Sequence, residues 1–171
     1  SFAVSGSTST LSLNLGASDV LAASRVSNVS NGHLVLKGSG TYDLGSTKIL
    51  ASGVTLGTDW TGSVRLTGAT LAGDTLAGLS TEQSTVELCG VRGYLSRADS
   101  ETGAQTYAAN LKLTNNGSSA AWELNNGYNG DVRIFSGDIS GTGTLQRSSY
   151  KGTNQTLIFT GDTSGWTGTL Q

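Results

Sequence analysis

The chain has 171 residues, of which 13% are charged, and its formal net charge is −2. Average domains carry about 25% charged residues, so this surface is close to neutral and, with abundant serine and threonine, rich in hydroxyl groups. The sequence has no basic patch to displace counterions from nucleic acid or to attract an anionic membrane, and no apolar run approaches the ~20 residues that cross a bilayer. We therefore expect neither nucleic-acid binding nor direct membrane insertion by this segment.

The first residues, Ser1 to Val4, contain no initiator methionine and no charged segment ahead of a long apolar one. The chain also stops at Gln171, inside a motif that recurs earlier. These two observations predict a processed product or a piece of a longer protein. We expect residues 1–171 to form one domain.

Short runs that alternate apolar and polar residues, bounded by Gly, Asn, Asp or Ser, follow one another and predict β-strands. They lie at 11–15, 33–37, 63–67, 85–88, 111–114, 131–135 and 156–160. The segment 15–27 is the one helix candidate, with a turn or two expected. Proline is absent, which fits extensive backbone pairing because each proline removes a donor from the ladder. Asn-Gly occurs at 31–32, 116–117, 126–127 and 129–130 and often forms hairpins, so an antiparallel meander is the alternative fold.

An aromatic residue followed two positions later by glycine recurs along the chain, in the pairs Trp60 and Gly62, Tyr128 and Gly130, and Trp166 and Gly168. Tyr94 lies midway between Trp60 and Tyr128. With Tyr94 included, successive aromatic residues are separated by about 34–38 residues, a spacing typical of structural repeats. With about three short strands flanking each copy, the pattern predicts a right-handed parallel β-helix of about five coils. We expect the aromatic residues to lie at one corner, where they cover the glycine backbone and hold the coils together.

The stretch 69–109 is less regular, and its polar run 97–105 predicts a loop that leaves the solenoid. Because loops on rigid scaffolds tend to carry specific contacts, Arg97, Asp99 and Glu101 are candidate ligand contacts; a solvated connection is the alternative. Arg65 and Arg133 each follow an aromatic residue of the recurring motif by five positions. Equivalent positions stack in a solenoid, so these two arginines predict a short basic ladder that could grip an acidic sugar, with a solvated strand face as the alternative.

The segments Gly-Thr-Gly-Thr-Leu at 141–145, Thr-Leu-Ile-Phe-Thr-Gly at 156–161 and Trp-Thr-Gly-Thr-Leu at 166–170 follow one another near the end of the chain. Their pattern resembles the autotransporter-associated β-strand repeat, most clearly in 136–171 and 38–68. The resemblance implies a parallel β-helix, export across the outer membrane of a Gram-negative bacterium, and display or release at the cell surface. Repeats of this family form a stalk and share no common activity.

Residues with catalytic or metal-binding chemistry are few. His33 is the only histidine and no Gly-x-Ser-x-Gly elbow accompanies it. Cys89 is the only cysteine, and neither a zinc ligand set nor a calcium-binding nonapeptide occurs. We therefore predict no catalytic residue, no metal and no cofactor. The rival class is a carbohydrate-active enzyme, a polysaccharide lyase or glycosidase, which needs paired carboxylates or carboxylates with Arg or Lys on one face.

We conclude from the sequence that the chain is a non-catalytic stalk or adhesin segment, surface-displayed or secreted. The expected partners are host or matrix glycans or proteins. Open sheet edges or flat faces at such a solenoid also predict self-association.

Overall fold

The computed structural model describes residues 10–26, 29, 33–45, 53–67, 70–72, 84–90, 92–96, 103–114, 121–125, 132–148 and 156–171. Its elements are almost all short strands: β1 (Thr10–Leu15), β2 (Val20–Ala22), β3 (His33–Gly38), β4 (Thr41–Gly45), β5 (Val54–Trp60), β6 (Ser63–Thr67), β7 (Thr70–Ala72), β8 (Thr85–Cys89), β9 (Arg92–Ser96), β10 (Ala104–Tyr107), β11 (Asn110–Thr114), β12 (Ala121–Asn125), β13 (Val132–Phe135), β14 (Ile139–Gly141), β15 (Thr144–Ser148), β16 (Thr156–Phe159) and β17 (Thr169–Leu170). Each segment predicted as a strand overlaps one of them.

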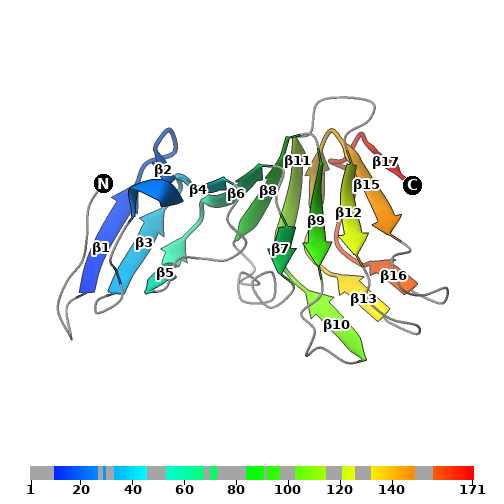
Figure 1. Cartoon of the computed structure of the whole chain (residues 1–171), viewed down its shortest axis with the longest axis horizontal. Coiled ribbons are helices and arrows are strands. Elements are labelled where there is room, and N and C mark those ends of the chain that lie inside the picture. The colour runs from blue at the N-terminus through cyan, green and yellow to red at the C-terminus, as the bar shows by residue number, and fades with distance from the viewer. Residues whose placement is uncertain are drawn as a thin grey trace.

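The strands form four parallel sheets that wind into a β-solenoid (Figure 1). The middle sheet has six strands, in the order β14-β11-β8-β6-β4-β2, and the third sheet has five, in the order β17-β15-β12-β9-β7. Two separate sheets have three strands each, in the orders β1-β3-β5 and β10-β13-β16. Except for β16, their strands come just before a strand of the middle sheet in the chain, and we call each of the two a first sheet. Every strand pair among the described residues is parallel, so the antiparallel meander is not the fold of this part of the chain.

Each complete coil visits the first, the middle and the third sheet in turn, as β10, β11 and β12 do and then β13, β14 and β15. Three short strands per coil is the predicted layout, and six strands in the longest sheet are close to the five coils expected. The coil length is shorter than predicted and varies. The shortest advance joins Leu34 to its partner Val54, and the longest joins Arg92 to its partner Ala121. A coil therefore takes about 20–30 residues, at the short end of the range for solenoid repeats, and the spacing of the aromatic motif is not the coil repeat.

The core lies between the sheets, and period-two alternation supplies it. Inward side chains of the middle sheet form two ladders along the solenoid axis, one with Tyr42, Val64, Val86, Leu111 and Ile139 and the other with Leu66, Leu88 and Leu113. All of these side chains are at most 1% exposed. Burial of each aliphatic side chain stabilises the fold by about 1.5–3 kcal/mol relative to leaving it in water, so stacking of successive coils is the main source of stability.

Of the segment 15–27, in which a turn or two of helix is expected, the described residues 15–26 form a tight turn, the strand β2 and one short helical turn. The Gly16 N–H donates to Asp19 Oδ2 at 2.7 Å, and the Asp19 N–H donates to the Gly16 carbonyl at 2.8 Å. These bonds close a turn that leads from β1 into β2, because an aspartate side chain can satisfy nearby backbone donors. The helical part is a single 3₁₀ turn, η1, at Ala23–Arg25.

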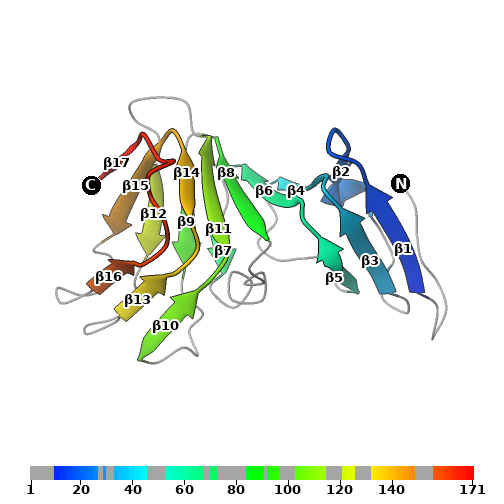
Figure 2. The same ribbon diagram turned by 180° about the vertical axis from the view of Figure 1, so that it is seen from behind.

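The first and last coils lie at opposite ends of the elongated molecule, with β1 at one end and β17 at the other (Figures 1 and 2). The middle sheet connects the two halves, because its six strands run without a break from β2 to β14. Side chains on its outer face are therefore held at regular heights along the axis.

Candidate binding surface

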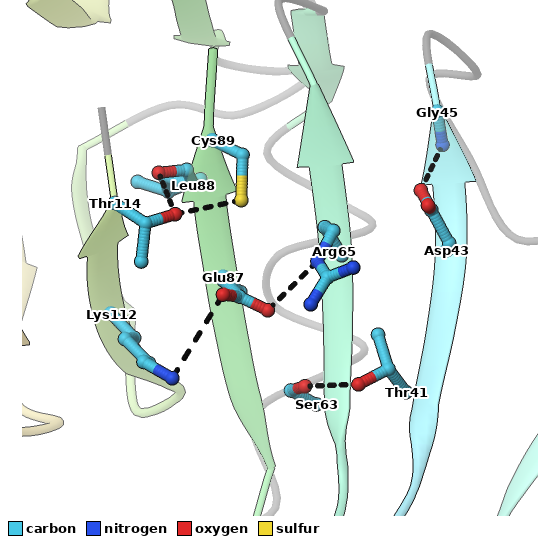
Figure 3. A network of polar contacts seen from close by, with 10 residues as sticks. All are labelled: Thr41, Asp43, Gly45, Ser63, Arg65, Glu87, Leu88, Cys89, Lys112 and Thr114. Carbon is cyan, nitrogen blue, oxygen red and sulfur yellow. Dashed lines mark hydrogen bonds and ion pairs between the residues drawn. The ribbon is translucent and has the colours of Figure 1, made fainter. Parts of the chain in front are cut away.

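A row of charged side chains crosses the outer face of the middle sheet. Asp43 in β4 pairs with Arg65 in β6, Arg65 pairs with Glu87 in β8, and Glu87 pairs with Lys112 in β11. The residues on either side of Arg65, Val64 and Leu66, are fully buried, so alternation directs the four charges outward. We call Asp43, Arg65, Glu87 and Lys112 the charged row; its signs alternate along the axis (Figure 3).

Glu87 is the centre of the interactions in the charged row. Arg65 Nε donates to Glu87 Oε2 at 2.9 Å, and Lys112 Nζ lies 3.9 Å from Glu87 Oε1. The Glu87 side chain is only 8% exposed, against 32% for Arg65 and 51% for Lys112. The carboxylate thus lies beneath two more accessible cations, where reduced screening strengthens its attraction to them.

The electrostatics of the charged row keep Arg65 charged. Burial lowers the pKa of Arg65, but the hydrogen bond and the charge of Glu87 together outweigh burial, and the net effect raises the pKa above its ordinary value. At the end of the row, Asp43 Oδ1 accepts a hydrogen bond from the Gly45 N–H at 2.8 Å. Each acid in the row therefore has a donor of its own in the same face.

Small polar side chains flank the charged row on both sides. On one side, Thr41 Oγ1 and Ser63 Oγ lie 3.3 Å apart. On the other, Cys89 Sγ and Thr114 Oγ1 lie 2.7 Å apart, and the Thr114 hydroxyl also donates to the Leu88 carbonyl at 3.4 Å. Burial raises the pKa of the Cys89 thiol, although the hydrogen bond with Thr114 opposes this. A protonated thiol is a weak nucleophile, and the observed role of Cys89 is its contact with the Thr114 hydroxyl on this face.

The structure separates the two arginines that the sequence placed in one ladder. Arg65 lies outward on the middle sheet, whereas Arg133 is in β13 of a first sheet and is 1% exposed. Arg133 shares its inward face with Phe135, and its guanidinium carbon lies 5.6 Å from the centroid of the Tyr107 ring. A desolvated cation over an aromatic face contributes about 2 kcal/mol. The predicted basic ladder is therefore wrong: Arg65 belongs to the charged row and Arg133 to the core.

Of the loop predicted at 97–105, residues 97–102 lie outside the described residues, and with them the predicted contacts Arg97, Asp99 and Glu101. The end of the predicted loop is wrong, because Ala104 and Gln105 begin β10 and pair with β13. Tyr128 and Gly130 lie outside them too. The predictions that concern these residues stay predictions.

Trp60 and Gly62 form a corner between the first and middle sheets. Trp60 pairs with Gly38 of the coil below, and the Thr61 N–H donates to the Gly38 carbonyl at 2.8 Å. Gly38 has a φ of 85°, which glycine adopts without steric cost. A Cβ on Gly62 would meet the Gly40 carbonyl oxygen and would lie 2.8 Å from the Trp60 ring. The indole thus covers the glycine backbone.

Trp166 and Gly168 make similar contacts at a different corner of the solenoid. Trp166 pairs with Gly141, whose φ is 86°, and the Thr167 N–H donates to the Gly141 carbonyl at 3.0 Å. The Trp166 indole N–H donates to the Gly143 carbonyl at 3.0 Å, and a Cβ on Gly168 would collide with both. This corner joins the middle sheet to the third sheet.

The three described aromatic residues of this series, Trp60, Tyr94 and Trp166, therefore do not share one corner. Trp60 ends a strand of a first sheet, Tyr94 lies in β9 of the third sheet, and Trp166 follows the middle sheet. The expectation of one ladder is wrong for these three, because the motif recurs at a longer interval than the coil does. The motif marks one local construction used at different corners.

Sequence reasoning missed the aromatic ladder that the structure contains. Tyr107, Phe135 and Phe159 stack on successive coils, with ring centroids 5.4 Å and 5.5 Å apart. Each ring is followed three positions later by Asn110, Asp138 or Asp162 at the corner into the middle sheet. The sequence does contain a signal of this ladder. A four-residue motif, an aromatic residue followed by Ser or Thr, Gly and Asp, occurs at 135–138 and again at 159–162.

The same corner carries a ladder of side-chain oxygens. Asn110 Oδ1 accepts the Asp138 N–H at 2.8 Å, and Asp138 Oδ1 accepts the Asp162 N–H at 2.9 Å. Asp162 in turn accepts hydrogen bonds from the Ser164 N–H and hydroxyl at 2.8 Å and 3.0 Å. The backbone bond from Ser164 and then its hydroxyl lower the pKa of Asp162. The carboxylate of Asp138 therefore links two coils, and that of Asp162 closes a turn within its own coil.

Within the described residues, no group of three or more His, Cys, Asp or Glu side chains is placed to hold a metal ion. The described part of the chain also contains no helix long and apolar enough to span a membrane. The fold and this face define a parallel β-solenoid whose middle sheet presents polar side chains and alternating charges on its outside. Comparison with protein families, with curated proteins and with solved structures finds no match.

Proposed function

We propose that this chain is a non-catalytic β-solenoid segment that acts as a stalk and adhesin, on the surface of a Gram-negative bacterium or secreted from it. Its ligands are host or matrix glycans or proteins. The observation that carries the proposal is the charged row, set on the outer face of the middle sheet between flanking hydroxyl groups.

A polar face of this kind suits a glycan better than an apolar ligand. The face offers donors at Arg65 and Lys112, acceptors at Asp43, and hydroxyls at Thr41 and Ser63. Sugar hydroxyl groups both donate and accept, so they match a surface that offers donors, an acceptor and hydroxyl groups on neighbouring strands. Shallow contacts of this sort are weak singly, and repeated display of one module raises the overall avidity.

The location rests on composition and on the repeat resemblance. The chain carries one cysteine and no proline, and its surface is close to neutral and rich in hydroxyl groups. A chain without disulfides passes through an oxidising periplasm without cross-links to delay it. This supports export as the route by which the solenoid reaches its ligands.

The rival class is a carbohydrate-active enzyme, because the charged row does bring acids beside cations on one face. Glu87, however, is held by Arg65 and Lys112, and Asp43 is bonded to the Gly45 backbone. Both carboxylates are thus engaged by donors of the protein, whereas the acid of a glycosidase must be free to protonate the leaving group of its substrate. Arg65 stays protonated and cannot serve as a base.

The test is a binding and turnover measurement on the same samples. The chain is passed over immobilised neutral and acidic polysaccharides and matrix proteins, and each soluble polysaccharide is assayed for cleavage. We expect saturable binding without cleavage, and we expect Lys112→Ala to weaken binding at least about threefold, the effect of one exposed charged contact. Lys37→Ala is the matched control, because Lys37 is 38% exposed on another sheet, where it pairs with Asp59 at 3.2 Å. Cleavage that Glu87→Gln abolishes would establish the rival instead.

A further inference from the structure

The order of charges along the charged row is self-complementary. From the β4 end to the β11 end the row runs Asp43, Arg65, Glu87 and Lys112, that is negative, positive, negative, positive. Reversing the row gives positive, negative, positive, negative. A row that faces a reversed copy of itself therefore meets the opposite charge at every position.

Only one of the two simple two-fold arrangements uses this property. A two-fold axis parallel to the strands, lying in the plane between two facing sheets, reverses the solenoid axis. It sets Asp43 of one copy opposite Lys112 of the other, and Arg65 opposite Glu87. A two-fold axis parallel to the solenoid axis sets each residue opposite itself, so that four like-charge pairs meet. Like charges at an interface oppose association, so the charge order selects the first arrangement.

The flanking residues are compatible with the same arrangement. In register with the charged row, β4, β6, β8 and β11 present Thr41, Ser63, Thr85 and Asn110. Under the selected two-fold axis, Thr41 lies opposite Asn110 and Ser63 opposite Thr85. These side chains are short and each can donate and accept hydrogen bonds. Two such faces can approach closely, as small residues allow, at the angle of about 30° usual for packed sheets.

We propose that the outer face of the middle sheet binds the same face of a second copy of this chain, as an isologous pair with antiparallel solenoid axes. This deepens the proposed adhesin function, on which it rests, by naming one partner of the same surface. At the centre, the Arg65–Glu87 ion pair of one copy faces the same ion pair of the other copy in reverse order, which brings four charges into one network. Asp43 and Lys112 close the pair at its two ends.

The size of the face sets the strength of the pair. Six strands at ~4.8 Å and five residues at ~3.3 Å give a face of roughly 475 Å², about 60% of the ~800 Å² per partner that stable complexes bury. We therefore expect a dissociation constant of about 0.1–1 mM for isolated molecules. Many copies on one surface would bind a second surface far more tightly through avidity.

The test uses two charge reversals that are complementary only across the two-fold axis. Sedimentation is measured from about 10 µM to 1 mM for the wild type, Lys112→Glu and Asp43→Lys, each alone, and for an equimolar mixture of the two variants. Each variant alone sets two like-charge pairs at the ends, so we expect its dissociation constant to rise about tenfold. In the mixture, one end pairs the lysine introduced at position 43 with the glutamate introduced at position 112, and the other end keeps the native pair. Association of the mixture therefore returns to the wild-type level.

Two further measurements keep the test independent of how the variants fold. Raising salt from about 0.05 M to 0.5 M is expected to weaken wild-type association, because the ion pairs are then screened. Lys37→Glu is the control and is expected to associate like the wild type, since Lys37 lies on a first sheet. A wild type that stays monomeric to about 1 mM, or a mixture no stronger than its parts, would overturn the pairing. Neither result bears on glycan or matrix binding, which the earlier assay measures in the monomer.

Discussion

At the scale of single residues, close backbone contact at the corners decides which residue is allowed. Gly62 illustrates this, because its φ is ordinary and the constraint is steric: the Gly40 carbonyl and the Trp60 ring occupy the space of a Cβ. Gly45 is the opposite case, with open space around it and a φ of 57°. Packing therefore requires glycine at position 62, and backbone conformation requires it at position 45.

We predict that Gly62→Ala lowers the free energy of unfolding by about 1–3 kcal/mol, the usual cost of overpacking. The added methyl group must push back a carbonyl of the coil below and so disturb the hydrogen bond between the Ser63 N–H and the Gly40 carbonyl at 3.0 Å. Urea denaturation measures the change. Gly165→Ala is the matched control, because its Cβ would lie 3.4 Å from Ser140, an ordinary contact. Equal effects of the two substitutions would contradict the steric argument.

At the scale of elements, ladders of like residues link a strand to its neighbours above and below. Phe135 in β13 is 1% exposed and has an aromatic neighbour on both sides, whereas Phe159 in β16 is half-buried and, within the described residues, stacks on Phe135 alone. We predict that Phe135→Ala costs about 3–5 kcal/mol of unfolding free energy. Phe159→Ala should lower the free energy of unfolding by less than Phe135→Ala does. The difference should be at least the contribution of one aromatic pair, about 0.5–1.5 kcal/mol. Chemical denaturation compares the two, and a loss at Phe159 equal to that at Phe135 would show that ring stacking adds nothing.

The type of the elements with a clear apolar and polar alternation was predictable from the sequence, because alternation is local. The strand β2 was not predictable in this way, since it lies in the segment expected to be helical. The runs at 33–37 and 63–67 became β3 and β6 almost residue for residue. The coil length was not predictable in the same way. Corners and loops differ in length from coil to coil, so the advance from Leu34 to Val54 is shorter than that from Arg92 to Ala121. The spacing from Trp60 to Tyr94 therefore does not equal one coil, because it joins residues of two different sheets.

The candidate site was predictable only in part for the same reason. Arg65 was singled out for its place after Trp60, yet its partners in the charged row, Glu87 and Lys112, lie one and two coils further along the chain. Only the register of β6, β8 and β11 brings them together. Arg133 shows the converse, since nothing local distinguishes an inward arginine from an outward one until the parity of its strand is known.

At the scale of the whole molecule, a solenoid is held together by contacts between neighbouring coils, so stability varies along its axis. The central strands of the middle sheet have a partner on each side, and Leu88 and Leu113 there are fully buried. Strands at either end have one partner and expose apolar residues: Leu11 is 43% exposed and Leu170 is 51% exposed. We predict that amide hydrogen exchange is slowest in β6, β8 and β11 and becomes faster toward β1 and β17.

Hydrogen exchange followed by NMR or mass spectrometry tests this gradient, and one variant separates it from simple solvent exposure. Leu88→Ala leaves a cavity in the central coil and should cost about 2–5 kcal/mol there. If the coils are coupled only to their neighbours, exchange in β6 and β11 should accelerate strongly while exchange in β1 and β17, already limited by fraying, changes little. If the solenoid instead opens as one unit, the slowest-exchanging amides of both halves would accelerate by the same factor. That uniform response would mean that the continuous middle sheet makes the whole stack one cooperative body.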